Sequence, residues 1–218
     1  MKKIVLIHAV QVAIQPIVDA FNEHWPEAEL IHLWDQTLSI ERAKTDHIND
    51  FLYQRIDALY DLAKCSGGDA IMFTCSAFGE AIDRVAEQSD IPVLKPNQAM
   101  FEQALMMGGK VGMIGSFLPA MEGMEKEFIQ LADLHNSSAS ISSICVAKAR
   151  EALTTGNINL HNQLTLEATY QLEQCSVIML AHFSSSHALN LLTSKCDKPI
   201  LSSPKCAIEY IKNQLITN

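Results

Sequence analysis

The two halves of the chain repeat one pattern of buried strands, and this repeat constrains the fold more than any other feature. A shift of 107 residues places the apolar run after Lys3 on the apolar run after Lys110. The same shift aligns 70–73 with 177–180, and it aligns two proline-containing segments without a gap. Halves of about 100 residues have the usual size of a domain. We therefore expect two equivalent half-domains that face each other across a cleft.

Apolar runs of four to six residues alternate with segments of helical periodicity, which is typical of parallel sheets covered on both faces by helices. The predicted strands are 3–8, 29–33, 69–74, 91–94, 110–115, 140–145, 176–181 and 198–202. The predicted helices are 12–24, 39–65, 77–89, 97–107, 118–132, 147–152, 157–174, 185–195 and 204–216. The expected fold class is α/β, with a four-stranded parallel sheet in each half. We assign 1–95 and 206–218 to the first half-domain and 96–205 to the second.

The composition argues against nucleic-acid and membrane partners. The net charge is −9 and no cluster of Lys and Arg occurs, so binding to nucleic acid would gain no counterion release. No apolar run reaches the roughly 18 residues needed to span a bilayer. The six cysteines form no C-x-x-C pair, and the apolar stretch near the first residue is broken by His8 and Gln11. We therefore expect reduced thiols and a cytoplasmic location.

Four strand ends are the places to look for a ligand site. Ligands of parallel sheets bind beyond the carboxyl ends of the strands. The residues there are His8-Ala9, the segment 74–77, the segment 115–117 and the segment 181–184. The repeat matches the first segment to the third and the second to the fourth, so we expect all four at one cleft. It places Cys75 opposite His182.

Cys75 is the candidate base or nucleophile. It follows a buried strand and precedes a helix predicted to begin near Ala77. A thiol at a helix N-terminus is stabilised as thiolate, so we expect a lowered pKa for Cys75. The alternative is an ordinary buried cysteine, since cysteine is among the most buried residue types. The position opposite His182 in the repeat favours a function.

His182 is the candidate acid on the facing strand end. Imidazole is the side chain best suited to proton transfer near neutral pH. The alternative is a structural histidine followed by serines that cap a helix. Hydroxyl and backbone N–H groups around both residues are suited to hold a carboxylate. The predicted substrate-binding residues are His8, Thr74, Ser76, Ala77, Ser116, Phe117, Phe183 and Ser184.

No motif for a nucleotide cofactor or a metal ion is present. The sequence contains neither G-x-G-x-x-G nor G-x-x-x-x-G-K-[ST], and it contains no H-E-x-x-H. No clustered set of carboxylates suggests a metal site. We therefore expect chemistry that uses no cofactor and no metal.

Two pseudo-symmetric halves, each with a reactive residue at the end of its third strand, resemble the aspartate/glutamate racemase superfamily. This superfamily includes glutamate, aspartate and hydantoin racemases, maleate isomerase and arylmalonate decarboxylase. The resemblance covers the whole chain and implies flavodoxin-like half-domains and catalysis without cofactor or metal. In the racemases two cysteines flank the α-carbon of the substrate. One cysteine abstracts the proton and the other returns a proton to the opposite face.

Segment 74–77, Thr-Cys-Ser-Ala, resembles the first cysteine motif of this family. The resemblance implies that Ser76 and the N–H of Ala77 bind the substrate carboxylate, and that Ser116 also contacts the substrate. The chain departs from the racemases at the second site, where His182 replaces the cysteine. His8-Ala9 replaces the aspartate-serine pair of glutamate racemases. A two-thiol mechanism therefore cannot operate from these two positions.

The expected function is that of a racemase or isomerase acting on a small carboxylate, either an amino acid or a dicarboxylate. Cys75 would act as base or nucleophile and His182 as the opposing acid. A decarboxylase or a cis-trans isomerase that uses Cys75 covalently is the close alternative. A carboxylate-binding protein without catalysis is the alternative from another class. A redox-sensing role is less favoured, because no resolving cysteine lies near Cys75 in the sequence. Assembly into a homo-oligomer is left open.

Overall fold

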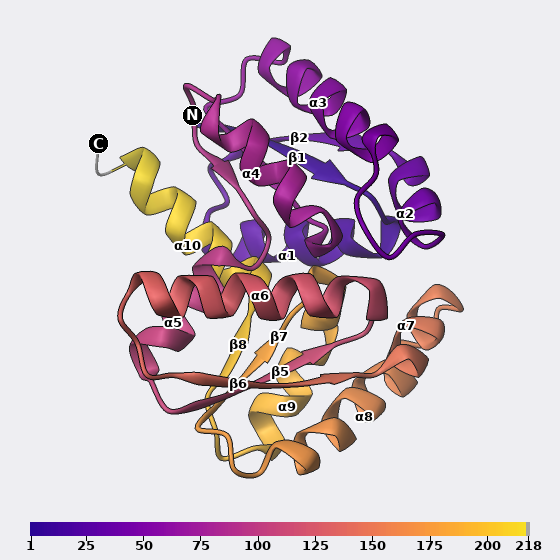
Figure 1. The fold of residues 1–218 in the computed structure, drawn as a ribbon, viewed down its shortest axis with the longest axis vertical. Helices are drawn as coiled ribbons and strands as arrows, with labels where there is room; N and C mark the ends of the chain where they lie inside the picture. Colours follow the sequence, from indigo (N-terminus) through magenta and orange to yellow (C-terminus); the bar gives the residue numbers. More distant parts are fainter. Residues whose placement is uncertain (217–218) are drawn as a thin grey trace.

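Two parallel four-stranded sheets, one in each half of the chain, form the frame of the protein (Figure 1). The computed structural model describes residues 1–216. The first sheet has the order β2-β1-β3-β4 and contains β1 (Lys3–His8), β2 (Glu29–Trp34), β3 (Ala70–Phe73) and β4 (Val93–Leu94). The second sheet has the order β6-β5-β7-β8 and contains β5 (Lys110–Gly115), β6 (Ser140–Cys145), β7 (Val177–Leu180) and β8 (Ile200–Ser202). The predicted fold class is confirmed.

The sequence repeat extends to the pairing register of the strands. Ile4 of β1 pairs with Ala70 of β3, and 107 residues later Val111 of β5 pairs with Val177 of β7. The pairing of β3 with β4 and that of β7 with β8 follow the same shift. Equivalent strand ends of the two sheets therefore occupy equivalent places in the two halves.

The helices of the first half are α1 to α5, together with two short 3-10 turns. Their bounds are η1 (Gln11–Ala13), α1 (Ile14–His24), α2 (Gln36–Arg42), α3 (Asp50–Cys65), η2 (Ser76–Phe78), α4 (Gly79–Glu87) and α5 (Gln98–Met107). The single helical stretch predicted for 39–65 is wrong, because two helices occur there. Asp35 caps the first helix by accepting the N–H of Thr37, and Asn49 caps the second by accepting the N–H of Leu52. Each cap satisfies a backbone donor that a helix start would leave free, so the chain begins a new helix at each cap.

The helices of the second half follow the same order. Their bounds are α6 (Leu118–Leu134), α7 (Ala147–Thr154), α8 (Ile158–Thr169), η3 (Tyr170–Leu172), η4 (Phe183–Ala188), α9 (Leu189–Lys195) and α10 (Ser203–Ile216). Both β3 and β7 lead into a 3-10 turn before the next α-helix begins. Within residues 1–216, no helix combines the length and the apolar composition needed to cross a membrane.

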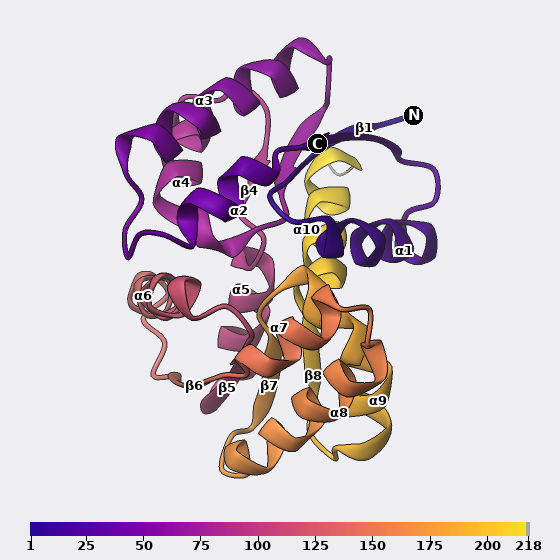
Figure 2. The ribbon, with the colours of Figure 1, turned by 90° about the vertical axis from the view of Figure 1, so that its right-hand side faces the viewer.

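The last helix of each half crosses to the other half. Helix α10 runs beside α1 of the first half (Figure 2), and its Ile208 and Ile211 are buried in one apolar cluster with Phe21. Helix α5 packs on the second half, where the ring of Phe101 meets that of Phe128 edge-on with centroids 5.7 Å apart. Helices α5 and α10 therefore join the two halves. The boundaries at 95/96 and 205/206 stay a prediction.

Candidate active site

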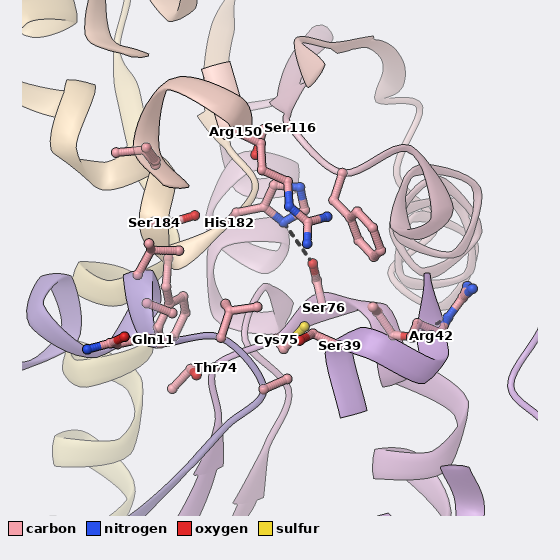
Figure 3. Close-up of a pocket in the computed structure, with 18 of the residues that line it drawn as sticks. Gln11, Ser39, Arg42, Thr74, Cys75, Ser76, Ser116, Arg150, His182 and Ser184 are labelled. Carbon is pink, nitrogen blue, oxygen red and sulfur yellow. Dashed lines mark hydrogen bonds between the residues drawn. The ribbon is translucent and has the colours of Figure 1, made fainter. Parts of the chain in front are cut away.

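The ends of strands from both sheets open onto one cavity of about 460 Å³ between the halves (Figure 3). The cavity lining includes Ala9 after β1, Cys75 after β3, Ser116 after β5 and His182 after β7. The cavity therefore lies where a ligand of parallel sheets is expected. Of the residues predicted to act or bind, those that line it are Thr74, Cys75, Ser76, Ala77, Ser116, Phe117, His182, Phe183 and Ser184. Their chemical roles stay predictions.

Cys75 and His182 share one backbone conformation at the two equivalent strand ends. Both are extended, with φ and ψ of −123° and 120° at Cys75 and of −131° and 143° at His182. Each residue stands immediately before a 3-10 turn. This local similarity places the thiol and the imidazole at the same cavity from opposite halves.

The thiol of Cys75 is held in its protonated form by burial. Desolvation raises the pKa of Cys75 above its ordinary value, while the N–H of Ala77 and the charges of Arg150 and Arg42 act in the opposite direction. The expectation of a lowered pKa is therefore wrong. The segment after Cys75 is a 3-10 turn of three residues, and α4 begins only at Gly79. Removal of the thiol from water outweighs the favourable contacts of this short turn.

The imidazole of His182 binds across the cleft to a hydroxyl of the other half. Its Nδ1 lies 3.0 Å from Oγ of Ser76, and this bond is drawn as the dashed line in Figure 3. Burial, together with the charge of Arg150, lowers the pKa of His182 to about 4, so the ring is neutral at neutral pH. The other ring nitrogen is buried and has no partner among the described residues. A Cβ at Gly115 would lie 3.3 Å from that nitrogen and would overlap the sulfur of Met121, so a larger residue there would require Met121 to shift.

Arg42 is a cavity residue that the sequence did not single out, and its guanidinium joins the two halves. It is only 5% exposed and donates to the carbonyl oxygens of Thr45, Ala77 and Pro119. The bond to Ala77 measures 3.0 Å and the bond to Pro119 measures 2.7 Å. With its donors engaged by backbone, Arg42 contributes mainly charge to the cavity.

Arg150 is the second missed residue, and it is differently placed. Its guanidinium carbon lies 4.0 Å from the centroid of the Phe117 ring, at a distance suited to a cation–π contact. Within residues 1–216 it has no ion pair and no side-chain hydrogen bond. Figure 3 shows it beside His182 at the cavity. The sequence offered no means to choose Arg150 over Lys148, which is also in α7 but is exposed.

The cavity is electropositive in an otherwise acidic protein. The chain has a net charge of −9, yet among the described residues no Asp or Glu lines the cavity, which contains Arg42 and Arg150. Charges in a cleft with low-dielectric walls act strongly on a bound ion. The arrangement is therefore suited to a small anion. Within residues 1–216, no group of three or more His, Cys, Asp or Glu side chains is placed to hold a metal ion.

His8 is placed behind the cavity wall, not on it. The side chain is fully buried, with Nδ1 2.9 Å from Oγ1 of Thr74 and Nε2 2.9 Å from Nδ1 of His32. His32 is exposed on β2, at the edge of the sheet. Burial, with a smaller contribution from His32, lowers the pKa of His8 to about 4. His8 thus reaches the cavity only through the hydroxyl of Thr74.

Comparisons with known proteins agree with this geometry. A family model described as Asp/Glu/hydantoin racemase matches residues 10–144, more than half of the chain. Among solved structures, a glutamate racemase from Francisella tularensis in complex with D-glutamate is 15% identical, with a TM-score of 0.75, over 100% of this chain and 82% of that one. An allantoin racemase from Pseudomonas fluorescens is 14% identical, with a TM-score of 0.69, over 99% of this chain and 92% of that one.

A third similar structure is a mutant of arylmalonate decarboxylase in its sulfate-associated form. It is 12% identical, with a TM-score of 0.66, over 96% of this chain and 92% of that one. A search of curated proteins found no match. At these identities the structural likeness shows the fold alone.

Proposed function

Because the chain belongs to the Asp/Glu/hydantoin racemase family, we propose that it moves a proton at the carbon next to the carboxylate of a small organic acid. Cys75 of the first half carries the proton in this proposal, and His182 of the second half, which is bonded to Ser76, stands opposite. The observation that carries this proposal is the unpaired guanidinium of Arg150 at a cavity without acidic residues among those described. A cation of this kind binds a carboxylate in bidentate fashion.

The same groups that bind the acid would stabilise the charge that forms during the reaction. Loss of a proton from the α-carbon leaves an enolate-like anion on the carboxylate oxygens. Preorganised donors and cations placed at such oxygens lower the barrier, because they need no rearrangement as the charge develops. Arg150, the hydroxyl of Ser116 and the N–H of Ala77 are donors at this cavity. The charges of Arg150 and Arg42 also favour the thiolate of Cys75 once its proton has left.

Decarboxylation is the second candidate, and the protonation state of Cys75 favours it. In this reaction a malonate-type acid loses CO₂, the electron pair of the broken bond enters an enolate, and the thiol gives its proton to carbon. The thiolate then regains a proton from water. A raised pKa keeps the thiol of Cys75 ready as the donor. One thiol suffices, and Cys75 is the only cysteine that lines the cavity among the described residues. Covalent addition by Cys75 is less favoured, since it needs the thiolate at the outset.

A panel of acids incubated in deuterated water tests both candidates. The acids are D- and L-aspartate, D- and L-glutamate, D- and L-malate, maleate and phenylmalonate. Proton NMR follows deuterium at the α-carbon, loss of CO₂ and double-bond isomerisation, while chiral chromatography follows racemisation. Turnover should fall at least about 100-fold in Cys75→Ser, because a serine hydroxyl is a far weaker acid and base. Cys65→Ser is the matched control, since Cys65 is exposed and does not line the cavity.

Three results would contradict the proposal. Wild-type turnover of any panel acid by Cys75→Ser would mean that Cys75 is not the proton carrier. Binding of carboxylates without turnover would identify the chain as a carboxylate-binding member of the family without catalysis. Arg150→Met should weaken binding of every acid that turns over, and unchanged affinity in this variant would remove Arg150 from the site.

A further inference from the structure

We propose that the acid bound in this cavity carries no amino group on its α-carbon. The inference rests on the proposed carboxylate site and narrows its substrate class. It assigns to the site acids whose α-substituent is a hydroxyl or an apolar group. Amino acids, in which the same position carries an ammonium ion, are excluded by the charges that surround the ligand.

The lining offers no anion to pair with an ammonium group. Among the described residues it contains two guanidinium groups, Arg42 and Arg150, and no carboxylate. An ammonium ion taken out of water loses its hydration, and in proteins a buried charge is usually compensated by an opposite charge. Both fixed charges of the described lining have the same sign as the ammonium ion. An α-ammonium held beside Cys75 would therefore lose hydration and would also be repelled.

The protonation of His182 indicates how the cavity affects a further positive charge. His182 lines the cavity at the end of β7, in the second half, and lies beside Arg150 (Figure 3). Burial of the ring, with a smaller contribution from the charge of Arg150, lowers the pKa of His182 to about 4, so the imidazole is not protonated at neutral pH. Both effects act in the same direction on an ammonium ion bound in the same cavity.

The remaining lining suits a neutral substituent. The lining also contains the neutral polar side chains of Gln11, Ser39 and Thr154. Each can bond to a hydroxyl or a carbonyl group without a change of charge. Trp34 and Leu153 add apolar surface to the same cavity. A hydroxy acid or an alkyl- or aryl-substituted acid is therefore accommodated where an amino acid is not.

Binding of matched acids tests the inference without requiring turnover. Succinate, malate and aspartate share one four-carbon skeleton and differ in having hydrogen, hydroxyl or ammonium at the α-carbon. Their dissociation constants for the whole protein are measured by calorimetry at pH 7, with both enantiomers of malate and aspartate. Succinate and at least one malate should bind at least about tenfold more tightly than either aspartate, because a single unpaired charge near two cations is enough for that difference.

Gln11→Glu provides the matched gain of charge. Gln11 lines the cavity at the start of η1, and glutamate has nearly the same shape. The new carboxylate should reduce the preference for malate over aspartate by at least about threefold, because it supplies the missing partner of the ammonium group. Gln88→Glu is the control, since Gln88 is exposed at the end of α4 outside the cavity and adds the same charge to the protein.

Each outcome decides the inference. A large preference for malate or succinate that shrinks in Gln11→Glu and persists in Gln88→Glu supports it. Equal or tighter binding of aspartate by the wild type overturns it and leaves the carboxylate site standing. A preference that Gln11→Glu does not change overturns the charge argument. Failure of succinate, malate and aspartate alike to bind overturns both this inference and the proposed function.

Discussion

The buried histidine behind the cavity should make the protein sensitive to mild acid. His8 is fully buried between Thr74 and His32, and burial lowers its pKa from 6.5 to about 4. Between these two values the unfolded chain takes up a proton at this residue and the folded chain does not. The stability that depends on neutral His8 is therefore fully present above pH 6.5 and is lost as the pH falls toward 4. At about 1.4 kcal/mol per pKa unit, His8 accounts for a loss of roughly 3 kcal/mol.

The assay is urea unfolding of the wild type and of His8→Gln between pH 7 and pH 4. At pH 7 the variant should be less stable by about 1–3 kcal/mol, because Thr74 and His32 lose a partner. Between pH 7 and pH 4 the variant should lose roughly 3 kcal/mol less stability than the wild type. His135→Gln is the control, because His135 is exposed at the end of α6.

Parallel pH profiles for the wild type and His8→Gln would refute this reasoning, since the acid sensitivity would then come from other groups. His32→Gln separates the two causes of the shift. The proximity of His32 also lowers the pKa of His8, and burial is the larger cause. The acid-induced loss should therefore shrink in His32→Gln but should not disappear. A complete loss of the effect in His32→Gln would mean that burial is not the main cause.

Three further predictions concern the cavity and the contact between the halves. At pH 7 Cys75 should react with iodoacetamide more slowly than exposed Cys65, and its labelling should become faster in the alkaline range, because burial raises its pKa. Mass spectrometry of the labelled peptides checks this, and faster labelling of Cys75 than of Cys65 at pH 7 would contradict it. Arg42→Met should lower the free energy of unfolding by about 3 kcal/mol, because backbone carbonyls of both halves lose a buried donor. A change below about 1 kcal/mol in urea unfolding would show that the hydrogen bonds of Arg42 contribute little. His182→Cys should increase racemisation of a chiral acid relative to its decarboxylation, since two thiols can exchange a proton on both faces of the α-carbon. Chiral chromatography measures the ratio, and an unchanged ratio would argue against a role of His182 in proton transfer.

The sequence alone determined the strands and the place of the cavity. Strand positions follow from apolar runs, which depend on neighbouring residues only. The pairing of Ile4 with Ala70 and of Val111 with Val177 follows from a repeat that keeps one spacing. Because parallel strands bring their carboxyl ends to one edge, the same pattern predicted that Cys75 and His182 would line one cavity. The break between α2 and α3 escaped prediction, since Asp35 and Asn49 act as caps only once their side chains fold back on the next turn.

Only the tertiary structure decided the charge and protonation of the site. The helix predicted to begin near Ala77 suggested a lowered pKa for Cys75, whereas burial raises it. Arg150 and the neighbouring Lys148 look alike in the sequence, and only the packing of α7 turns Arg150 toward the cavity while Lys148 stays exposed. The bond between Ser76 and His182 joins residues 106 positions apart. Desolvation and Coulomb interactions depend on distances between atoms from separate elements, and these distances exist only after the two halves have packed together.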